Sequence, residues 1–542
     1  RHLLDGQPIA AGDRLDLTRL TPGRHRWEAV AERPGAPPVR SDAELVIVPG
    51  LDLVEQAVAD FLAGREIPAD LSLSTRQEMG SVREQVRAGR TDLARQALRK
   101  VLRALEDPRI EVPERLIHQI RYLDLFGRLE PEVAMGESGC TPADIVVEVG
   151  DAVRWRHPAK AAQAAKGEIR LAATDGSFFS PAISSGTWSR TFDQEGKVEY
   201  LCGTSRGTLS VEPRKADVRE TAMRGPGRVP TVLAIDKDLS VWFSAGGGGY
   251  ASLASIPLNN VVGRVRRNGE VEEFRTPTPE SAPTSIKVAP DGTIWFTERA
   301  ANKIGRLDPA TGTITEFDVP TERSAPTGIA VAPDGGVWFT EKMAGKIGRF
   351  DPESRTFTEY PTPTPKAEPS TVVLDAEGYV WFDERGADTL NRMDPKTGEV
   401  TSFKVPTQGS RVIGLVPDPR GYMWFLELAG HKVGRLEVAT GQIVEYTIPT
   451  KLASPFKAAL DRHGRLWFTQ AYGNKIGLLQ GERFFELALP REASMPGGIE
   501  ITPEGHVWFT QQAADIIGYI PFAAEIFSPP DSGLIEEARP EG

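Results

Sequence analysis

Residues 281–320 read SAPTSIKVAPDGTIWFTERAANKIGRLDPATGTITEFDVP, and close variants of this unit follow one another through the C-terminal part of the chain. A Trp-Phe pair marks each unit, and self-similarity with a period in the low forties is typical of four-stranded propeller blades. The pairs begin at Trp242, Trp295, Trp338, Trp381, Trp424, Trp467 and Trp508. We therefore predict a seven-bladed β-propeller over residues 225–529.

Turn signals divide the quoted unit into strands. Asp291-Gly292, Asn302 and the stretch Asp308–Gly312 contain residues that tolerate or preset turn dihedrals. Three turns separate four short segments and so predict four antiparallel strands. A glycine inside the third strand predicts that a neighbouring sheet packs closely there. It recurs as Gly263, Gly305, Gly348, Gly434, Gly477 and Gly518, with Asn391 in the fourth unit.

Two segments compete to complete the last sheet and close the ring. Val218–Met223 resembles the outer-strand pattern TITEFDV, and Ala524–Ser528 has a similar pattern. Residues 530–542 are rich in Pro, Gly and Glu, which predicts a disordered tail.

Composition excludes several classes of function. With 64 basic and 75 acidic residues the formal net charge is −11, and no run of Lys or Arg occurs, which argues against a nucleic-acid partner. No apolar run has the length of a membrane span, and no signal peptide is visible. Because the chain begins at Arg1 and inside the resembled β-sandwich domain, we expect a processed or truncated precursor.

The N-terminal part is predicted to hold separate modules. Residues 1–49 contain alternating runs and turn signals, and they resemble the end of an immunoglobulin-like β-sandwich. Residues 50–128 change to a helical period, with an apolar stripe at Val54, Val58 and Phe61, for example. This stretch resembles the FIVAR-like helical bundles of bacterial surface proteins. A spacer is favoured over a sugar-binding attachment, because charged residues crowd its outer faces.

Residues 133–213 resemble a cupredoxin, a small β-sandwich that usually holds copper with two His, one Cys and one Met. Cys202 falls on the family's Cys position in EYLC, the first family His falls near Ile169, and the loop Gly203–Gly207 holds neither the second His nor the Met. His157 could substitute, but a solvated loop residue is favoured. We therefore expect a cupredoxin-like domain without copper.

The two cysteines of the chain, Cys140 and Cys202, both lie in this module. A disulfide between them would fit an oxidising compartment, whereas two unpaired thiols are the alternative. Pairing is slightly favoured.

Propeller function is expected at one mouth of the central channel, where each first strand enters through a proline. One ring of residues follows these prolines and is mildly polar: Thr231, Thr284, Thr327, Ser370, Val412, Phe456 and Gly497. A second ring lies three residues after each Trp: Ala245, Glu298, Glu341, Glu384, Glu427, Gln470 and Gln511. The four glutamates could hold a cation or a basic peptide. The favoured alternative is that each glutamate forms an ion pair with a basic residue such as Arg306, Lys346, Arg392 or Arg435.

The units PTSIKVAPDGTIWFTERAANKIGR and PTGIAVAPDGGVWFTEKMAGKIGR resemble those of the virginiamycin B (streptogramin) lyases over roughly 300 residues. The resemblance implies a propeller that opens the ester of a cyclic depsipeptide by elimination, with Mg²⁺ at the channel mouth. It also implies two catalytic histidines, a glutamate and a tyrosine. At the corresponding positions this chain has Phe456, Gly497, Gln511-Gln512 and Thr231. Its propeller histidines, His431, His463 and His506, are predicted to lie in turns away from the mouth.

Two functions follow from these observations. The favoured one is an exported or cell-surface protein whose non-catalytic propeller binds a protein, peptide or glycan, without a cofactor and with possible self-assembly. The alternative is a lyase of the streptogramin-lyase type with an altered site, in which Glu298, Glu341, Glu384 and Glu427 surround Mg²⁺. Electron transfer through copper is a third and weaker possibility.

Overall fold

The computed structural model describes the chain with gaps. The described residues are 2–4, 7–9, 23–31, 39–47, 51–63, 67–107, 109–110, 112, 116, 120, 124, 129, 131–136, 139–148, 151–157, 171–175, 180, 186–192, 196–202, 205–213, 218–225, 227–246 and 259–521. The chain divides into one compact unit within residues 1–215 and a second within 216–524. Among the described residues, no helix is long and apolar enough to cross a membrane.

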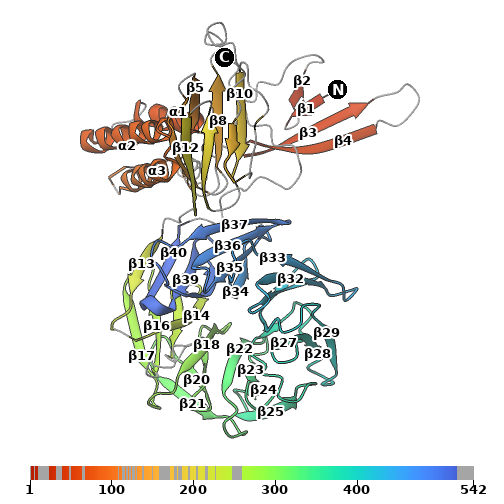
Figure 1. The fold of residues 1–542 in the computed structure, drawn as a ribbon. Coiled ribbons are helices and arrows are strands. Elements are labelled where there is room, and N and C mark those ends of the chain that lie inside the picture. The colour runs from red at the N-terminus through yellow and green to blue at the C-terminus, as the bar shows by residue number, and fades with distance from the viewer. Residues whose placement is uncertain are drawn as a thin grey trace. The chain divides into compact units, whose positions relative to one another are not determined.

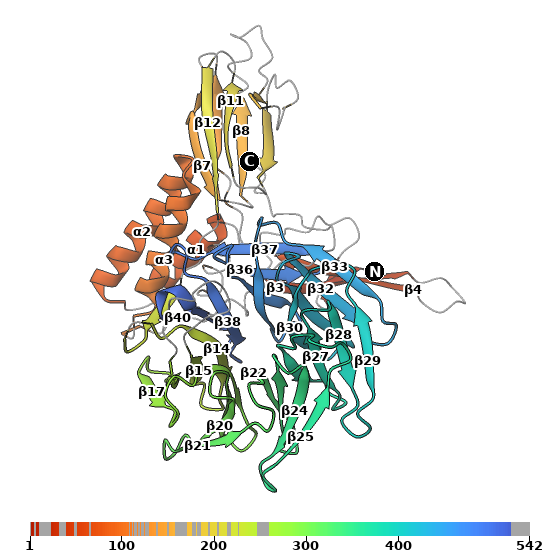
Figure 2. The same ribbon diagram turned by 60° about the horizontal axis from the view of Figure 1, so that its bottom comes forward.

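The described part of the second unit contains seven four-stranded antiparallel sheets, which stand as blades in a ring (Figure 1, Figure 2). In blades 1 to 6 the strands lie side by side in chain order. Blade 1 contains β14 (Pro230–Ile235), β15 (Val241–Ala245), β16 (Val261–Val265) and β17 (Val271–Arg275). Blade 2 contains β18 (Pro283–Val288), β19 (Ile294–Glu298), β20 (Lys303–Leu307) and β21 (Ile314–Asp318). Blade 3 contains β22 (Pro326–Val331), β23 (Val337–Glu341), β24 (Lys346–Asp351) and β25 (Thr356–Pro361).

The remaining blades repeat this plan. Blade 4 contains β26 (Val372–Leu374), β27 (Val380–Glu384), β28 (Thr389–Met393) and β29 (Val400–Lys404). Blade 5 contains β30 (Val412–Asp418), β31 (Tyr422–Glu427), β32 (Lys432–Glu437) and β33 (Ile443–Thr447). Blade 6 contains β34 (Pro455–Leu460), β35 (Leu466–Gln470), β36 (Lys475–Gln480) and β37 (Arg483–Ala488). Blade 7 contains β38 (Pro496–Ile501), β39 (Val507–Gln511), β40 (Ile516–Ile520) and β13 (Arg219–Ala222), with the short 3-10 helix η2 (Gln512–Ala514) before β40. The predicted number of blades is confirmed.

Strand β13 closes the ring. It pairs antiparallel with β40, so that Thr221 lies opposite Ile517, and it supplies the outer strand of blade 7 from a segment that precedes blade 1. This outcome confirms the prediction for Val218–Met223. The competing segment 524–528 and the predicted tail 530–542 lie outside the described residues.

The apolar core of the propeller lies between neighbouring blades. In one buried cluster, Ala234 and Trp242 of blade 1 pack with Ile286 and Phe296 of blade 2. A four-stranded sheet cannot bury its own faces, so each blade depends on its neighbours for stability.

The glycine of the third strand has a cause inside its own blade. A Cβ atom on Gly305 in β20 would lie 2.2 Å from the ring of Phe296 in β19, and Gly348 and Phe339 repeat this arrangement at 2.1 Å. The close neighbour is therefore the Phe of the Trp-Phe pair and not another sheet, which corrects the prediction. In blade 4, Asn391 occupies the position and its Oδ1 accepts a 2.6 Å hydrogen bond from Ser402.

The described part of the first unit contains three helices and three sheets. The helices are α1 (Leu51–Ala63), α2 (Ala69–Arg87) and α3 (Thr91–Leu105). One sheet, in the order β2-β1-β3-β4, contains β1 (His2–Leu4), β2 (Gln7–Ile9), β3 (Gly23–Ala31) and β4 (Val39–Ile47). A second sheet, β10-β8-β5-β6, contains β5 (Glu132–Gly136), β6 (Gly139–Thr141), β8 (Ala152–His157) and β10 (Gly186–Thr191). The third, β7-β12-β11-β9, contains β7 (Asp144–Glu148), β9 (Leu171–Ala173), β11 (Gly196–Cys202) and β12 (Ser205–Glu212).

The second and third sheets share one core, in which Trp155 of β8 lies beside Tyr200 of β11. Cys140 and Cys202 join these two sheets through a disulfide with an S–S distance of 1.98 Å. The sulfur at the cupredoxin Cys position is thus bonded to a second cysteine. Residues 169 and 203–204 lie outside the described residues, and the backbone of His157 ends β8. The module names immunoglobulin-like, FIVAR-like and cupredoxin-like stay predictions.

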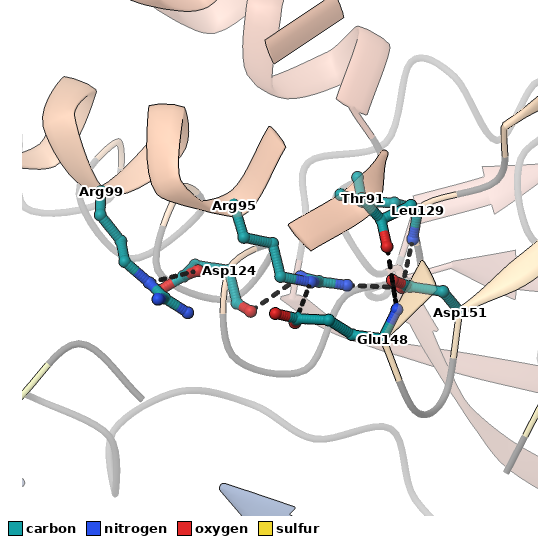
Figure 3. A network of polar contacts seen from close by, with 7 residues as sticks. All are labelled: Thr91, Arg95, Arg99, Asp124, Leu129, Glu148 and Asp151. Carbon is teal, nitrogen blue, oxygen red and sulfur yellow. Dashed lines mark hydrogen bonds and ion pairs between the residues drawn. The ribbon is translucent and has the colours of Figure 1, made fainter. Parts of the chain in front are cut away.

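A buried ion network ties helix α3 to the third sheet (Figure 3). The Arg95 guanidinium lies 2.5 Å from an Asp151 oxygen and 2.9 Å from a Glu148 oxygen, and the arginine side chain has no exposed surface. The Thr91 hydroxyl accepts a 2.9 Å hydrogen bond from the Glu148 backbone N–H. Removing one partner from such a network leaves an uncompensated buried charge, so the helix and the sheet depend on each other.

Candidate functional site

The two ends of the propeller are defined by how the first two strands of a blade pair. Pro283 at the start of β18 lies opposite Glu298 at the end of β19, and Pro326 lies opposite Glu341 in the same way. Residues just before a first strand and just after a second strand therefore share one end, which we call the proline end. The opposite end, which holds the turn between first and second strands, is the hairpin end.

The polar residues that follow the prolines are buried, and their hydroxyl groups form hydrogen bonds with nearby atoms of the protein. Thr231, Thr284 and Thr327 each donate a hydrogen bond of 2.9–3.1 Å to the carbonyl two residues earlier. The Ser370 hydroxyl lies 3.1 Å from both oxygens of Asp383. All four side chains are buried, and these hydroxyls form hydrogen bonds within the protein at the start of the first strands of blades 1 to 4.

The glutamates of the second ring are also buried, inside the blades. Glu298, Glu341, Glu384 and Glu427 have no exposed surface. In blade 3, Glu341 lies beside Glu359, which binds the Lys346 ammonium group at 2.7 Å and the Thr321 backbone N–H at 3.1 Å. Blades 2 and 5 repeat this arrangement. Burial of these carboxyl groups does not favour the alternative in which they hold a cation at the channel mouth.

Burial makes three of these carboxyl groups weak acids. It raises the pKa of Glu298 to about 8, and the neighbouring carboxylate of Glu316 adds to the shift. For the same reasons the pKa values of Glu341 and Glu427 are raised to about 7. Each can then donate its proton to the second carboxylate of its blade.

The remaining four blades fill the equivalent position in other ways. Gln470 of blade 6 donates from Nε2 to Glu486 at 2.7 Å, and Gln511 of blade 7 donates to Glu220 of β13 at 2.8 Å. In blade 4, Glu384 accepts from the backbone N–H and the hydroxyl of Thr364, both at 2.9 Å. In blade 1, Ala245 occupies the position.

The basic residues expected to pair with these glutamates have other partners. Lys346 binds Glu359 instead of Glu341. The guanidinium of Arg306 lies 5.7 Å from the ring centre of Trp295, and those of Arg392 and Arg435 lie at similar distances from Trp381 and Trp424. Arg306 also pairs with Asp291 of the hairpin end at 3.6 Å. Among the described residues, no ion pair with a ring glutamate is found for Arg306, Arg392 or Arg435, and Lys346 interacts with Glu341 electrostatically while its ion pair is with Glu359.

The positions of the two family histidines are filled differently here. Phe456 is 4% exposed and belongs to the core cluster that contains Ile413 and Leu426. At Gly497, a Cβ atom would lie 2.1 Å from Nε2 of Gln512 and 2.9 Å from Oγ1 of Thr510. The Gln512 side chain thus occupies the space that any side chain on residue 497 would need.

One histidine lies at the proline end, which corrects the prediction. His431 follows the second strand of blade 5 with a left-handed backbone (φ 55°), and its Nδ1 accepts the backbone N–H of Ser454 at 3.2 Å. Asn474 has the same role in blade 6, where its Oδ1 accepts from the Ser494 N–H at 2.9 Å. His431 is therefore explained by loop structure. His463 and His506 lie at the hairpin end, as predicted.

A group of cations at the proline end was not predicted from the sequence. Arg299, Lys342 and Arg385 each follow the glutamate that ends the second strand, in blades 2, 3 and 4. Arg411, at the same end, directly precedes the first strand of blade 5. The signal was present, because a basic residue follows the ring glutamate in three consecutive units.

Charged residues also meet inside the channel. Lys287 of β18 and Glu500 of β38 form an ion pair of 3.4 Å although blade 1 separates their blades, so they meet within the ring. Lys457 of β34 lies near both. Burial, together with a smaller effect of Lys287, lowers the pKa of its ammonium group to about 8, although Asp383 and Glu500 oppose the shift.

The described residues do not fit the magnesium ion that the family resemblance implies. Mg²⁺ prefers ionised, accessible carboxylates with octahedral geometry. The ring glutamates are buried, and a lysine of the same blade serves as the cation in blades 2, 3 and 5. Within the described ranges, no three His, Cys, Asp or Glu side chains gather in a way that would hold a metal ion.

Comparisons with known proteins agree with this fold. No curated protein matches the chain. A solved structure of virginiamycin B lyase from Staphylococcus aureus is similar, with 30% identity, a TM-score of 0.52, and coverage of 57% of this chain and 99% of that one. A streptogramin B lyase structure has the same identity and TM-score, with coverage of 56% and 96%.

A third structure is a histidine-to-alanine variant of the Staphylococcus aureus lyase, described as catalytically inactive and solved with quinupristin. It also shows 30% identity and a TM-score of 0.52, and covers 57% of this chain and 99% of that one. The profile of the virginiamycin B lyase family matches residues 216–520, which is more than half of the chain and contains all seven blades. The chain belongs to the virginiamycin B lyase family.

Proposed function

We propose that the propeller binds a ligand at its proline end and does not catalyse the ester-opening elimination expected of a streptogramin lyase. The observation that carries this proposal is the Gln512 amide packed against Gly497, together with Phe456 in the core. Both family histidine positions are thereby filled by groups that cannot take up a proton.

The chemistry supports this reading. An elimination needs a base beside the acidic C–H and a group that takes up the developing negative charge. The catalytically inactive variant of the similar lyase differs from its parent by the loss of one histidine. This chain has no histidine at either of the two family positions, and its buried glutamates do not replace the magnesium site.

We further propose that the protein is exported or displayed on a cell surface, with the N-terminal modules as spacers. The Cys140–Cys202 disulfide supports an oxidising compartment. It also supports a cupredoxin-like module that works without copper, because the sulfur of Cys202 is bonded to Cys140.

The test is an incubation of the full chain with quinupristin and Mg²⁺, with linear product detected by mass spectrometry. We expect no product above the protein-free control, while the Staphylococcus aureus lyase converts the same substrate in parallel. Turnover by this chain at a rate comparable with that enzyme would overturn the proposal.

A lyase with a different base is the second candidate, because of one observation. Lys457 follows Phe456 directly and is the channel amine whose pKa burial lowers to about 8, near the range useful for a general base. If linear product forms, Lys457→Met abolishes it under this alternative. A product that persists in Lys457→Met would exclude that role.

A further inference from the structure

Lys457 occupies a position of the first strand that other blades fill with uncharged residues. Its backbone N–H donates to the Thr469 hydroxyl of the second strand at 3.2 Å. The same contact recurs in blades 1, 2, 3 and 7, where the donating residues are Val232, Ser285, Gly328 and Gly498. The amine of Lys457 is therefore a feature of blade 6 and not of the repeat.

The repeat also indicates what this position faces. A Cβ atom on Gly328 of blade 3 would lie 2.5 Å from the Ser370 carbonyl oxygen of blade 4, and one on Gly498 would lie 2.8 Å from the first strand of blade 1. The position thus faces the start of the first strand in the next blade. For Lys457 that strand is β38, which continues after its proline with Gly497 and Gly498. The lysine therefore faces backbone that carries no side chains.

The charged neighbours of Lys457 are engaged with other groups. Lys287 and Glu500 form an ion pair of 3.4 Å within the ring. Asp383 is buried and accepts the Ser370 backbone N–H at 2.6 Å. Lys457 interacts electrostatically with all three charged groups. No hydrogen bond or ion pair joins its ammonium group to another residue in the described part of the propeller.

These surroundings favour the neutral amine of Lys457. Burial and, to a smaller extent, Lys287 lower its pKa from 10.5 to about 8, while Asp383 and Glu500 oppose the shift. Near pH 8 about half of these amines carry a lone pair instead of a third proton. A partly buried lysine beside a second cation is the kind of amine that forms Schiff bases with carbonyl compounds. The side chain is half-buried, so a small molecule in the channel has access to it.

We infer that Lys457 is a nucleophile that binds a small aldehyde in the channel as a reversible imine. The nitrogen lone pair attacks the carbonyl carbon, a C–N bond forms, and the carbonyl oxygen takes up the proton that the nitrogen loses. The resulting carbinolamine loses its oxygen as water while the C=N bond forms. Protonated lysine and aldehyde thus give a protonated imine and one water, with no oxidant or reductant.

This inference goes beyond the proposed function. It concerns an amine inside the channel, whereas the proposed ligand binds at the proline end. It also differs from the role of Lys457 as a base in a lyase, because the nitrogen forms a bond to carbon and does not remove a proton from a C–H group. Imine formation requires no ester and no magnesium ion, so it is tested independently of ester cleavage.

Reductive trapping of the full chain tests the inference. The protein is incubated with a limiting amount of acetaldehyde and sodium cyanoborohydride, which converts the imine into a stable ethyl-lysine, and peptide mapping by mass spectrometry locates the product. At pH 7 we expect Lys457 to react at least about tenfold faster than the exposed Lys396, because more of its amine is neutral. The ratio of the two rates should fall between pH 7 and pH 9, since the neutral fraction of Lys457 approaches its limit.

Variants separate the amine from its surroundings. Lys457→Arg keeps a positive charge without a nucleophilic amine and should abolish the fast reaction while leaving that of Lys396 in place. Lys287→Met removes a cation that lowers the pKa of Lys457 and releases Glu500, so it should slow the reaction of Lys457 at pH 7. The matched control Lys396→Met should leave the rate at Lys457 unchanged. Thermal unfolding checks that each variant is folded.

Three results would each overturn the inference. They are a reaction of Lys457 no faster than that of Lys396, a fast reaction that persists at another site in Lys457→Arg, and an unchanged rate at Lys457 in Lys287→Met. The incubation with quinupristin is a separate measurement. Cleavage of quinupristin would refute the proposed function and leave the trapping result as it stands, and failure of trapping would leave the proposed function unaffected.

Discussion

The carboxyl group of Glu298 illustrates how burial sets chemistry at the scale of one residue. It has no exposed surface and lies beside the carboxylate of Glu316, so the neutral acid is favoured. Gln470 and Gln511 occupy equivalent positions in blades 6 and 7, where their amides donate to Glu486 and Glu220. In blades 6 and 7 the position thus supplies a neutral hydrogen-bond donor, and the protonated glutamates of blades 2, 3 and 5 can do the same.

Glu298→Gln should make the propeller less sensitive to alkaline pH. The pKa of Glu298 is raised from 4.5 to about 8 in the folded protein, so its stabilising contribution is complete below about pH 4.5 and is lost as the pH rises towards 8. The variant keeps a donor at every pH and should exceed the wild type at pH 8 by roughly 1–3 kcal/mol in the free energy of unfolding. Urea denaturation between pH 5 and pH 8 measures this difference.

The matched control is Glu322→Gln, which changes an exposed glutamate in the loop that enters blade 3. It should reproduce the pH dependence of the wild type. If Glu298→Gln and the wild type lose stability equally between pH 5 and pH 8, the neutral state assigned to Glu298 is wrong.

At the scale of the element, one threonine hydroxyl on the second strand of a blade links the first strand of its own blade to the first strand of the next blade. Thr297 of β19 accepts the Ser285 N–H of its own blade at 3.1 Å and donates to the Thr327 carbonyl of the next blade at 2.8 Å. Thr510 makes the corresponding contact with the Thr231 carbonyl at 3.4 Å, across the seam between blades 7 and 1. These hydrogen bonds therefore link the buried beginnings of first strands in neighbouring blades.

Thr297→Val should destabilise the propeller although it preserves the shape of the side chain. The substitution leaves a buried N–H and a buried C=O without their hydroxyl partner, which costs roughly 1–3 kcal/mol. Thermal or urea unfolding of the second unit measures the loss. Thr315→Val, on the exposed outer strand of the same blade, should be nearly neutral. Equal effects of the two substitutions would contradict the role given to Thr297.

At the scale of the whole molecule, the chain consists of two units whose stabilising contacts differ in kind. The propeller depends on repeated contacts between blades, whereas the first unit depends on long-range connections such as the Arg95 network and the Cys140–Cys202 disulfide. Stability of the first unit should therefore respond to changes that leave the propeller unaffected.

Replacement of Cys140 and Cys202 by alanine tests this separation. The disulfide joins residues 62 positions apart, and loss of such a crosslink costs about 4 kcal/mol in the chain-entropy model. We expect the unfolding transition of the first unit to fall and that of the propeller to stay in place in differential scanning calorimetry. Reduction with dithiothreitol should mimic the variant in the wild type and have no effect on the variant itself. A comparable fall in the propeller transition would show that the two units unfold together.

Local features of the sequence determined the repeat, the four strands of each blade and the seven-fold ring, but they left two segments as candidates for closing it. Turn residues and alternating polarity act over a few positions, so a periodic sequence predicts a periodic fold. Only the tertiary structure decided which side chains reach the channel mouth. The first strands change register after their first residues, for example between Pro283 and Ile286, and periodicity does not reveal such a shift. Burial of the ring glutamates and the positions of His431 and of the four cations at the proline end depend on neighbours that are distant in sequence, so the sequence did not reveal them.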